Sequence, residues 1–215
     1  CLVGSEMCIR DSFTANAPQE LPVPEGNEIA DDLNAMARRA DLRLGSKDAH
    51  PANAAWVVAD PGQMLRPLTL ANADLTWVSH CVPGTPGFEL LSGLPAPIDY
   101  DYFVWKGVEP DLHPYGACYH DLAERRSTGV IEYLKVQQVG AVIVGGLALD
   151  YCVSTTARQL RQAGFQVLLY LPACRALTQE GAITACGALA AEGVILCGDE
   201  AALDHQLSLI KEARP

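Results

Sequence analysis

The residue best placed for covalent chemistry is Cys152, in the run AVIVGGLALDYCVSTTARQL (141–160). An apolar segment leads into Gly145 and Gly146 and then directly into a predicted helix whose first turn holds this cysteine. A helix N-terminus carries partial positive charge and unpaired N–H groups, which stabilise a thiolate and can bind an oxyanion. Taken alone, the pattern fits a nucleophile and a cysteine packed beneath a helix start equally well.

Two further sets of residues have types that could take part in a reaction. Lys106 ends the apolar run FVWKG (103–107), where a desolvated amine needs a partner. Asp48, His50 and His80 offer a carboxylate and two imidazoles, ligands that suit Zn²⁺, Mn²⁺ or Fe²⁺. By type and spacing alone, a surface lysine and a chance grouping of Asp and His are the more common explanations.

The elements that must position these residues alternate regularly in the second half of the chain. We predict strands at 42–48, 100–106, 140–145, 165–171 and 194–197, and helices at 27–40, 127–138, 150–163, 178–192 and 199–213, the first capped by Asn27. The stretch 49–98 has too many Pro and Gly residues for long elements, and we expect it to form a loop region covering a site.

This alternation predicts the fold class. Strands separated by helices of about 10–15 residues imply right-handed crossovers and a parallel sheet. We therefore expect an α/β fold, a three-layer sandwich with a central parallel, Rossmann-like sheet and helices on both faces. Ligands of such sheets bind beyond the carboxyl ends of the strands, so Asp48, Lys106 and the turn at 145–152 are expected on one rim.

Three motifs resemble those of one family. GLALDYCV (146–153) is similar to the nucleophile signature of the cysteine hydrolase superfamily, which includes nicotinamidases, pyrazinamidases and isochorismatase-like enzymes. SKDAHPAN (46–53) resembles the nicotinamidase K-D-x-H-P segment, and WVSHCVPGTPG (77–87) resembles its W-P-x-H-C-V-x-G-T-x-G segment. The resemblance runs from about Phe13 to Val194, with the three motifs in the family's order and spacing.

The resemblance implies roles for the reacting groups. Cys152 matches the nucleophile and Lys106 the lysine of a Cys, Lys, Asp triad. The Leu147–Ala148 peptide is expected to be cis, so that the N–H groups of Ala148 and Cys152 form an oxyanion hole. The resemblance also places aromatic side chains around a flat pyridine ring, at Phe13, Trp77 and Tyr115.

The resemblance further implies a divalent metal ion, Zn, Mn or Fe, held by Asp48, His50 and His80. The family has a further histidine a few residues after the first, and here that place holds Ala54. Metal binding is consequently expected to be weakened, rescued by water or a carboxylate such as Asp60, or lost.

The first strand departs from the family. Its aspartate base lies in a D-x-Q-x-D-F segment, but here Cys8 stands at the base and Asp11 is three residues out of phase. Residues 1–12, CLVGSEMCIRDS, resemble an artefact of sequence assembly. We therefore predict that residues 1–12 are a non-native segment and that 13–215 form a single isochorismatase-like hydrolase domain.

By this resemblance the expected function is hydrolysis of nicotinamide to nicotinate and ammonia through a cysteine thioester, in NAD salvage, impaired by loss of the aspartate. One alternative is a hydrolase of another small amide or carbamoyl compound, which the change to Ala54 favours. The other is a non-catalytic homologue that binds a small molecule, which Cys8 favours.

Composition excludes several classes of protein. The net charge of −11 over 215 residues argues against a nucleic-acid partner, and no apolar run reaches the roughly 18–20 residues that cross a bilayer. The segment 1–12 lacks the features of a secretory signal. Eight cysteines without a CxxC pair indicate reduced thiols and a cytoplasmic location. A homo-oligomer stays open, although the apolar face of Val153, Ala157 and Leu160 is interpreted as core.

Overall fold

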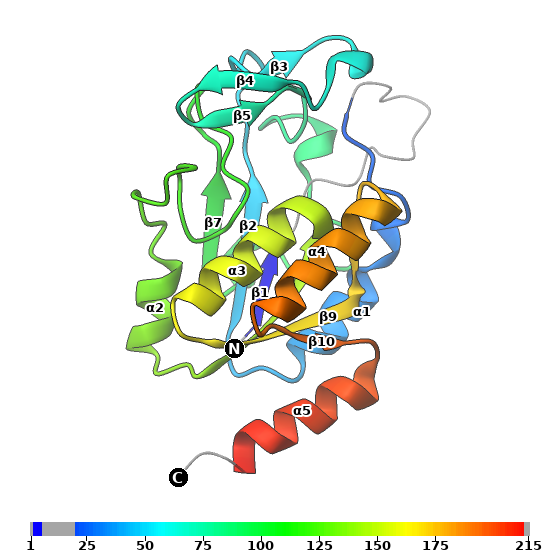
Figure 1. Ribbon diagram of the computed structural model, residues 1–215, viewed down its shortest axis with the longest axis vertical. Coiled ribbons are helices and arrows are strands. Elements are labelled where there is room, and N and C mark those ends of the chain that lie inside the picture. Colours follow the sequence, from blue (N-terminus) through cyan, green and yellow to red (C-terminus); the bar gives the residue numbers. More distant parts are fainter. Residues whose placement is uncertain (1, 6–19, 213–215) are drawn as a thin grey trace.

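A computed structural model of the protein describes residues 2–5 and 20–212. Its centre is a parallel sheet of six strands in the order β10-β9-β8-β1-β2-β7 (Figure 1). The strands are β1 (Leu2–Ser5), β2 (Arg43–Asp48), β7 (Tyr102–Lys106), β8 (Ala141–Leu147), β9 (Gln166–Arg175) and β10 (Ile195–Cys197). The strands expected from hydrophobic runs are all present.

Both faces of this sheet are buried, which explains its nearly continuous apolar strands. Along β8, Val142 and Val144 belong to one core cluster and Ile143 belongs to the other. One cluster includes residues of α2 (Val130–Val136), α3 (Ser154–Gln162) and α4 (Gln179–Ala191), while the other includes residues of α1 (Ala30–Ala37) and α5 (Glu200–Glu212). Figure 1 shows α3 and α4 crossing in front of the sheet. The predicted three-layer α/β sandwich is confirmed.

Several boundaries differ from the prediction, among them those of the first helix and of β9. The helix expected at 27–40 is a 3-10 turn (Gly26–Glu28) followed by α1, which ends at Ala37. The residue before α1 is Ile29, without a side-chain cap, so the predicted capping by Asn27 is wrong. β9 continues to Arg175, beyond the expected end at 171, after an irregularity in its pairing with β8.

The stretch 49–98 forms short elements, as its Pro and Gly content predicted. β3 (Val57–Val58) pairs in parallel with β6 (Trp77–Val78), and β4 (Pro67–Leu70) pairs with β5 (Ala73–Leu75). Short 3-10 turns begin at Pro61, Pro86 and Pro97. β3, β4 and β5 lie beyond the carboxyl ends of β2 and β7 (Figure 1). The stretch thus covers the rim at which a site was expected.

The first strand lies inside the segment that we predict to be non-native. β1 pairs in parallel with β2 on one side and β8 on the other. Its foreign origin and the boundaries of the single domain stay predictions. Cys8, Asp11 and Phe13 lie outside the described residues. Among the helices of the described ranges, none has the length and apolar character needed to cross a membrane.

Candidate active site

Cys152 lies where β8 gives way to a helix. β8 ends at Leu147, the Leu147–Ala148 peptide is cis as predicted, and a π-helical turn (Leu149–Val153) continues into α3. The cysteine is 3% exposed. Thr156 donates a hydrogen bond to the Cys152 carbonyl at 2.7 Å, which fixes the turn. Val153, Ala157 and Leu160 are fully buried, so the interpretation of that helix face as core is confirmed.

Lys106 connects Cys152 with Asp48. The parallel register pairs Asp48 at the end of β2 with Lys106 at the end of β7. Lys106 Nζ donates to Asp48 Oδ1 at 2.7 Å and to the Tyr115 carbonyl at 2.9 Å, and lies 3.8 Å from Cys152 Sγ. Lys106 and Asp48 are 1% and 2% exposed. The two strand ends therefore deliver a desolvated ion pair to the thiol.

The charges of this group depend on one another. Burial alone would lower the pKa of Lys106, but Asp48 and Cys152 raise it above its usual value. Burial alone would raise the pKa of Asp48, but Lys106 and the neighbouring imidazoles hold it below its usual value. Burial raises the pKa of Cys152 to about 11, against the opposing effects of Lys106 and the Ala148 N–H. Desolvation thus has a larger effect on the pKa of this thiol than the stabilising groups around it.

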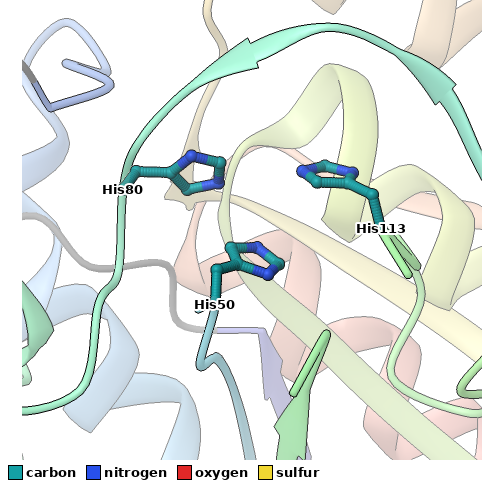
Figure 2. Close-up of side chains that lie close together, drawn as sticks. All are labelled: His50, His80 and His113. Atoms are coloured by element: carbon teal, nitrogen blue, oxygen red, sulfur yellow. The ribbon is translucent and has the colours of Figure 1, made fainter. Parts of the chain in front are cut away.

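Three imidazoles converge beside this group. Figure 2 shows the rings of His50, His80 and His113 turned toward one another. Each ring offers a nitrogen, and these atoms lie within 4.8 Å of one another. His50 Nδ1 donates to the Gly107 carbonyl at 3.1 Å and His80 Nδ1 to the Val78 carbonyl at 2.8 Å. Because a carbonyl only accepts, both rings carry the proton on Nδ1 and leave Nε2 as a lone pair.

The residues present fit a divalent metal ion. Burial lowers the pKa of His50 to about 3 and also lowers the pKa of His80 and His113, so all three are neutral imidazoles, the form that binds metal. Among the described residues, His50 Nε2 and both ring nitrogens of His113 are buried without a hydrogen-bond partner. Asp48 and Cys81 group similarly with His80. Asp48, His50 and His80 are thus brought together as the sequence predicted.

The sequence analysis missed His113. It stands in LHPYG (112–116), between β7 and α2, and neither a motif nor a spacing singles it out. Ala54 was expected to leave the site one histidine short, but His113 brings a third imidazole from a segment about 60 residues further along the chain.

Two of the three predicted aromatic residues, Trp77 and Tyr115, line the same pocket as the cysteine. Trp77, Tyr115, His113 and Tyr151 surround it, together with Asp48, His80, Ala148, Cys152, Leu21 and Leu177. Trp77 stacks on His113, with centroids 5.4 Å apart and planes at 7°. Tyr151 meets Trp77 edge-on at 5.0 Å, a contact that was not predicted. The pocket is largely apolar, and Cys152, His80 and His113 are among the residues that line it.

Comparison with known proteins agrees with this geometry. The isochorismatase domain model matches residues 19–201, most of the chain. A nicotinamidase of Escherichia coli (strain K12) is 31% identical over 163 residues, covering 72% of this chain and 75% of the relative.

Solved structures have the same fold. An Acinetobacter baumanii nicotinamidase pyrazinamidase superposes with a TM-score of 0.78 at 24% identity, over 94% of this chain and 97% of the other. A pyrazinamidase of Pyrococcus horikoshii, in complex with zinc, superposes with a TM-score of 0.70 at 25% identity, over 92% and 99%. The protein therefore belongs to the isochorismatase family, among the nicotinamidase-like amidohydrolases.

Proposed function

We propose that the protein hydrolyses nicotinamide to nicotinate and ammonia through a thioester on Cys152, as a step of NAD salvage in the cytoplasm. The observation that carries this proposal is the position of Lys106 Nζ, 2.7 Å from Asp48 and 3.8 Å from the Cys152 sulfur, because Asp48 and Cys152 line an aromatic pocket. The proposed partner is a small planar amide. The free, mostly buried cysteines of the described chain suit a reducing compartment.

The chemistry proceeds in two displacements at one carbonyl carbon. The Cys152 sulfur, once deprotonated, attacks the carboxamide carbon, and the N–H groups of Ala148 and Cys152 stabilise the oxyanion. The C–N bond then breaks, and the nitrogen takes a proton and leaves as ammonia. Water attacks the thioester, releases the carboxylic acid and returns the proton to the sulfur.

Lys106 acts in the reaction as a positive charge and not as a general base. Its raised pKa keeps the amine protonated, so it stabilises the thiolate and the negative charge that develops on the substrate. The proton of Cys152 needs another acceptor, and the family's first-strand aspartate corresponds to Cys8 in this sequence. General acid and base assistance is worth about 10²- to 10⁴-fold, so the chain as written is expected to be slower by that factor.

Asp48, His50 and His80 would hold a divalent metal ion, with zinc the form seen in the related pyrazinamidase. When bound, the metal supplies a Lewis acid that anchors a ring nitrogen of the substrate. The side chains around it would orient the ring: Trp77 and Tyr115 line the pocket, and Phe13 is proposed as a further wall.

A second candidate substrate is a small amide or carbamoyl compound without an aromatic ring. It is favoured by the stacking of Trp77 on His113, which already occupies one face of the indole. Stacking on that face is then denied to a pyridine, whereas a compact amide needs only the oxyanion hole and the thiol.

The test is ammonia release from purified protein supplied with Zn²⁺ or Mn²⁺. Three forms are compared: the chain as written, a form whose first twelve residues are replaced by a family-like strand bearing the aspartate, and Cys152→Ala in the repaired form. Nicotinamide, pyrazinamide and a set of aliphatic amides are offered in parallel.

We expect the repaired form to release ammonia from nicotinamide about 10²- to 10⁴-fold faster than the chain as written, and the Cys152→Ala form to release none. Turnover of aliphatic amides but not of nicotinamide would show that the substrate is a small amide without an aromatic ring. If the repaired form turns over no amide, the proposal of amidase activity is wrong and the protein is a small-molecule-binding homologue.

A further inference from the structure

We propose that His113 is a third imidazole ligand of the metal and that the resulting site prefers Zn²⁺ to Mn²⁺. His113 lies between β7 and α2, and it takes the part of the family histidine whose place is held by Ala54. This inference rests on the proposed function only in that a metal belongs in this pocket.

The first support is convergence. The nitrogen atoms of His50, His80 and His113 lie within 4.8 Å of one another. Ligand nitrogens of a tetrahedral Zn²⁺ site, with bonds of about 2.1 Å, lie about 3.4 Å apart, so side-chain rotations that move the rings together by about 1 Å would close the set on an ion. Asp48 Oδ1 lies 3.6 Å from His50 Nε2, which places a carboxylate at the same point.

The second support is the absence of any other use for the His113 nitrogens. Its side chain is buried, at 5% exposure, and among the described residues neither Nδ1 nor Nε2 has a hydrogen-bond partner. A buried polar group left unsatisfied costs about 1–3 kcal/mol. His50 and His80, in contrast, each satisfy Nδ1 on a backbone carbonyl. A ligand role accounts for His113 where packing alone does not.

The third support is that the backbone holds His113 in place. Its N–H donates to the Asn72 carbonyl at 2.7 Å. The Trp56 indole N–H donates to the Leu112 carbonyl at 2.9 Å, and Trp56 packs edge-on against the His113 ring with centroids 4.4 Å apart. Trp56 also meets the His50 ring edge-on at 4.7 Å. The Trp56 indole thus contacts both the His50 ring and the His113 ring, which come from different segments of the chain. Ala54 lies two residues before this tryptophan.

Three imidazoles change the chemistry of the site. Imidazole ligands suit Zn²⁺, whereas Mn²⁺ prefers carboxylate, carbonyl and water oxygens. Exchange of a water or a carboxylate for His113 therefore raises affinity for Zn²⁺ more than for Mn²⁺. The neighbouring carboxylate Asp48 is already engaged by Lys106, which leaves the imidazoles as the larger share of the ligand set.

The experiment compares the full-length wild-type protein with His113→Phe, which keeps a flat ring between Trp56 and Trp77 but has no ligand nitrogen. His205→Phe makes the same change on an exposed position of α5 and serves as the control. Zn²⁺ and Mn²⁺ affinities are measured by competition with a chelator in the absence of substrate. X-ray absorption at the zinc edge counts the imidazoles on the ion.

We expect wild type and His205→Phe to bind Zn²⁺ through three imidazoles. His113→Phe should lose at least about tenfold in Zn²⁺ affinity, since even outer partners of metal ligands are worth that much, and should retain two imidazoles. Its Mn²⁺ affinity should change less. Unaltered Zn²⁺ affinity in His113→Phe, or two imidazoles in wild type, would overturn the proposal. The wild-type count needs no variant, so it decides the matter even if His113→Phe fails to fold.

Metal binding and catalysis fail separately. Zinc held by three imidazoles in a protein that releases no ammonia overturns the nicotinamidase proposal and supports this one. Ammonia release from nicotinamide by a protein whose zinc affinity does not depend on His113 supports the nicotinamidase proposal and overturns the proposal that His113 is a ligand.

Discussion

At the scale of single residues, the site is governed by desolvation. Lys106, Asp48 and Cys152 are nearly inaccessible, so each charge depends on the others. Removing one partner of a buried ion pair costs about 3–5 kcal/mol because the other charge is left uncompensated. The ion pair therefore holds a positive charge beside the sulfur that the surrounding apolar core would otherwise expel.

The pKa of Cys152, raised by burial to about 11, predicts a strong pH dependence of its alkylation by iodoacetamide. Only the thiolate reacts, so the rate should rise about tenfold per pH unit from pH 7 and level off near the pKa. The measurement is mass spectrometry of the peptide containing Cys152 after timed labelling. Lys106→Met should slow labelling at every pH below the plateau, because the stabilising cation is gone.

Cys174 provides the comparison within the same protein. It is also buried, burial raises its pKa to about 12, and it should label more slowly than Cys152 throughout. A labelling rate for Cys152 that is already constant above pH 8 would contradict the assigned protonation state, and would show that the helix N-terminus outweighs desolvation.

At the scale of elements, β2 and β7 each end in one residue of the site, Asp48 and Lys106. The turn that holds Cys152 is connected by hydrogen bonds to the start of α4. Asp150, two residues before Cys152, accepts hydrogen bonds from the backbone N–H groups of Leu177 and Thr178, at 3.0 and 3.2 Å. Thr178 is the N-cap of α4 and accepts from the Gly181 N–H. Asp150 therefore anchors the start of α4 to the π-helical turn.

We predict that Asp150→Ala lowers the free energy of unfolding by about 1–3 kcal/mol, because two backbone N–H groups lose a charged acceptor. Urea unfolding followed by circular dichroism measures the change. Asp41→Ala, at an exposed position, is the matched control and should stay within about 0.5 kcal/mol of wild type. Equal stability of the two variants would show that water replaces the carboxylate at no cost.

At the scale of the whole molecule, the sheet depends on its first strand. β1 pairs with β8 through Leu2–Ser5 on one side and with β2 on the other. Without it, two strands that carry site residues at their ends would lose their shared neighbour, and their backbone N–H and C=O groups would lose their partners. Whatever its origin, a strand in this place is needed for the fold.

We predict that deletion of residues 1–12 abolishes cooperative thermal unfolding, whereas replacement by a family-like strand retains it. Differential scanning calorimetry on the three chains measures this. A deletion variant with an unchanged transition would show that β8 and β2 close on each other without β1.

The sequence by itself determined the alternation of strands and helices after β1, the parallel sheet, and the arrival of Asp48, Lys106 and Cys152 on one rim. It did so because hydrophobic periodicity is local and because parallel strands end at the same edge. The boundaries of the first helix were less certain, since Asn27 offered a cap that the chain does not use.

Only the tertiary structure decided that His113 joins His50 and His80, and that burial raises the pKa of Cys152. The position of His113 depends on hydrogen bonds to Asn72 and from Trp56, contacts between loops far apart in sequence that no spacing encodes. The protonation of the cysteine depends on how completely water is excluded, a property of the packed molecule. Local patterns specify elements, while burial and long-range contacts specify the chemistry between them.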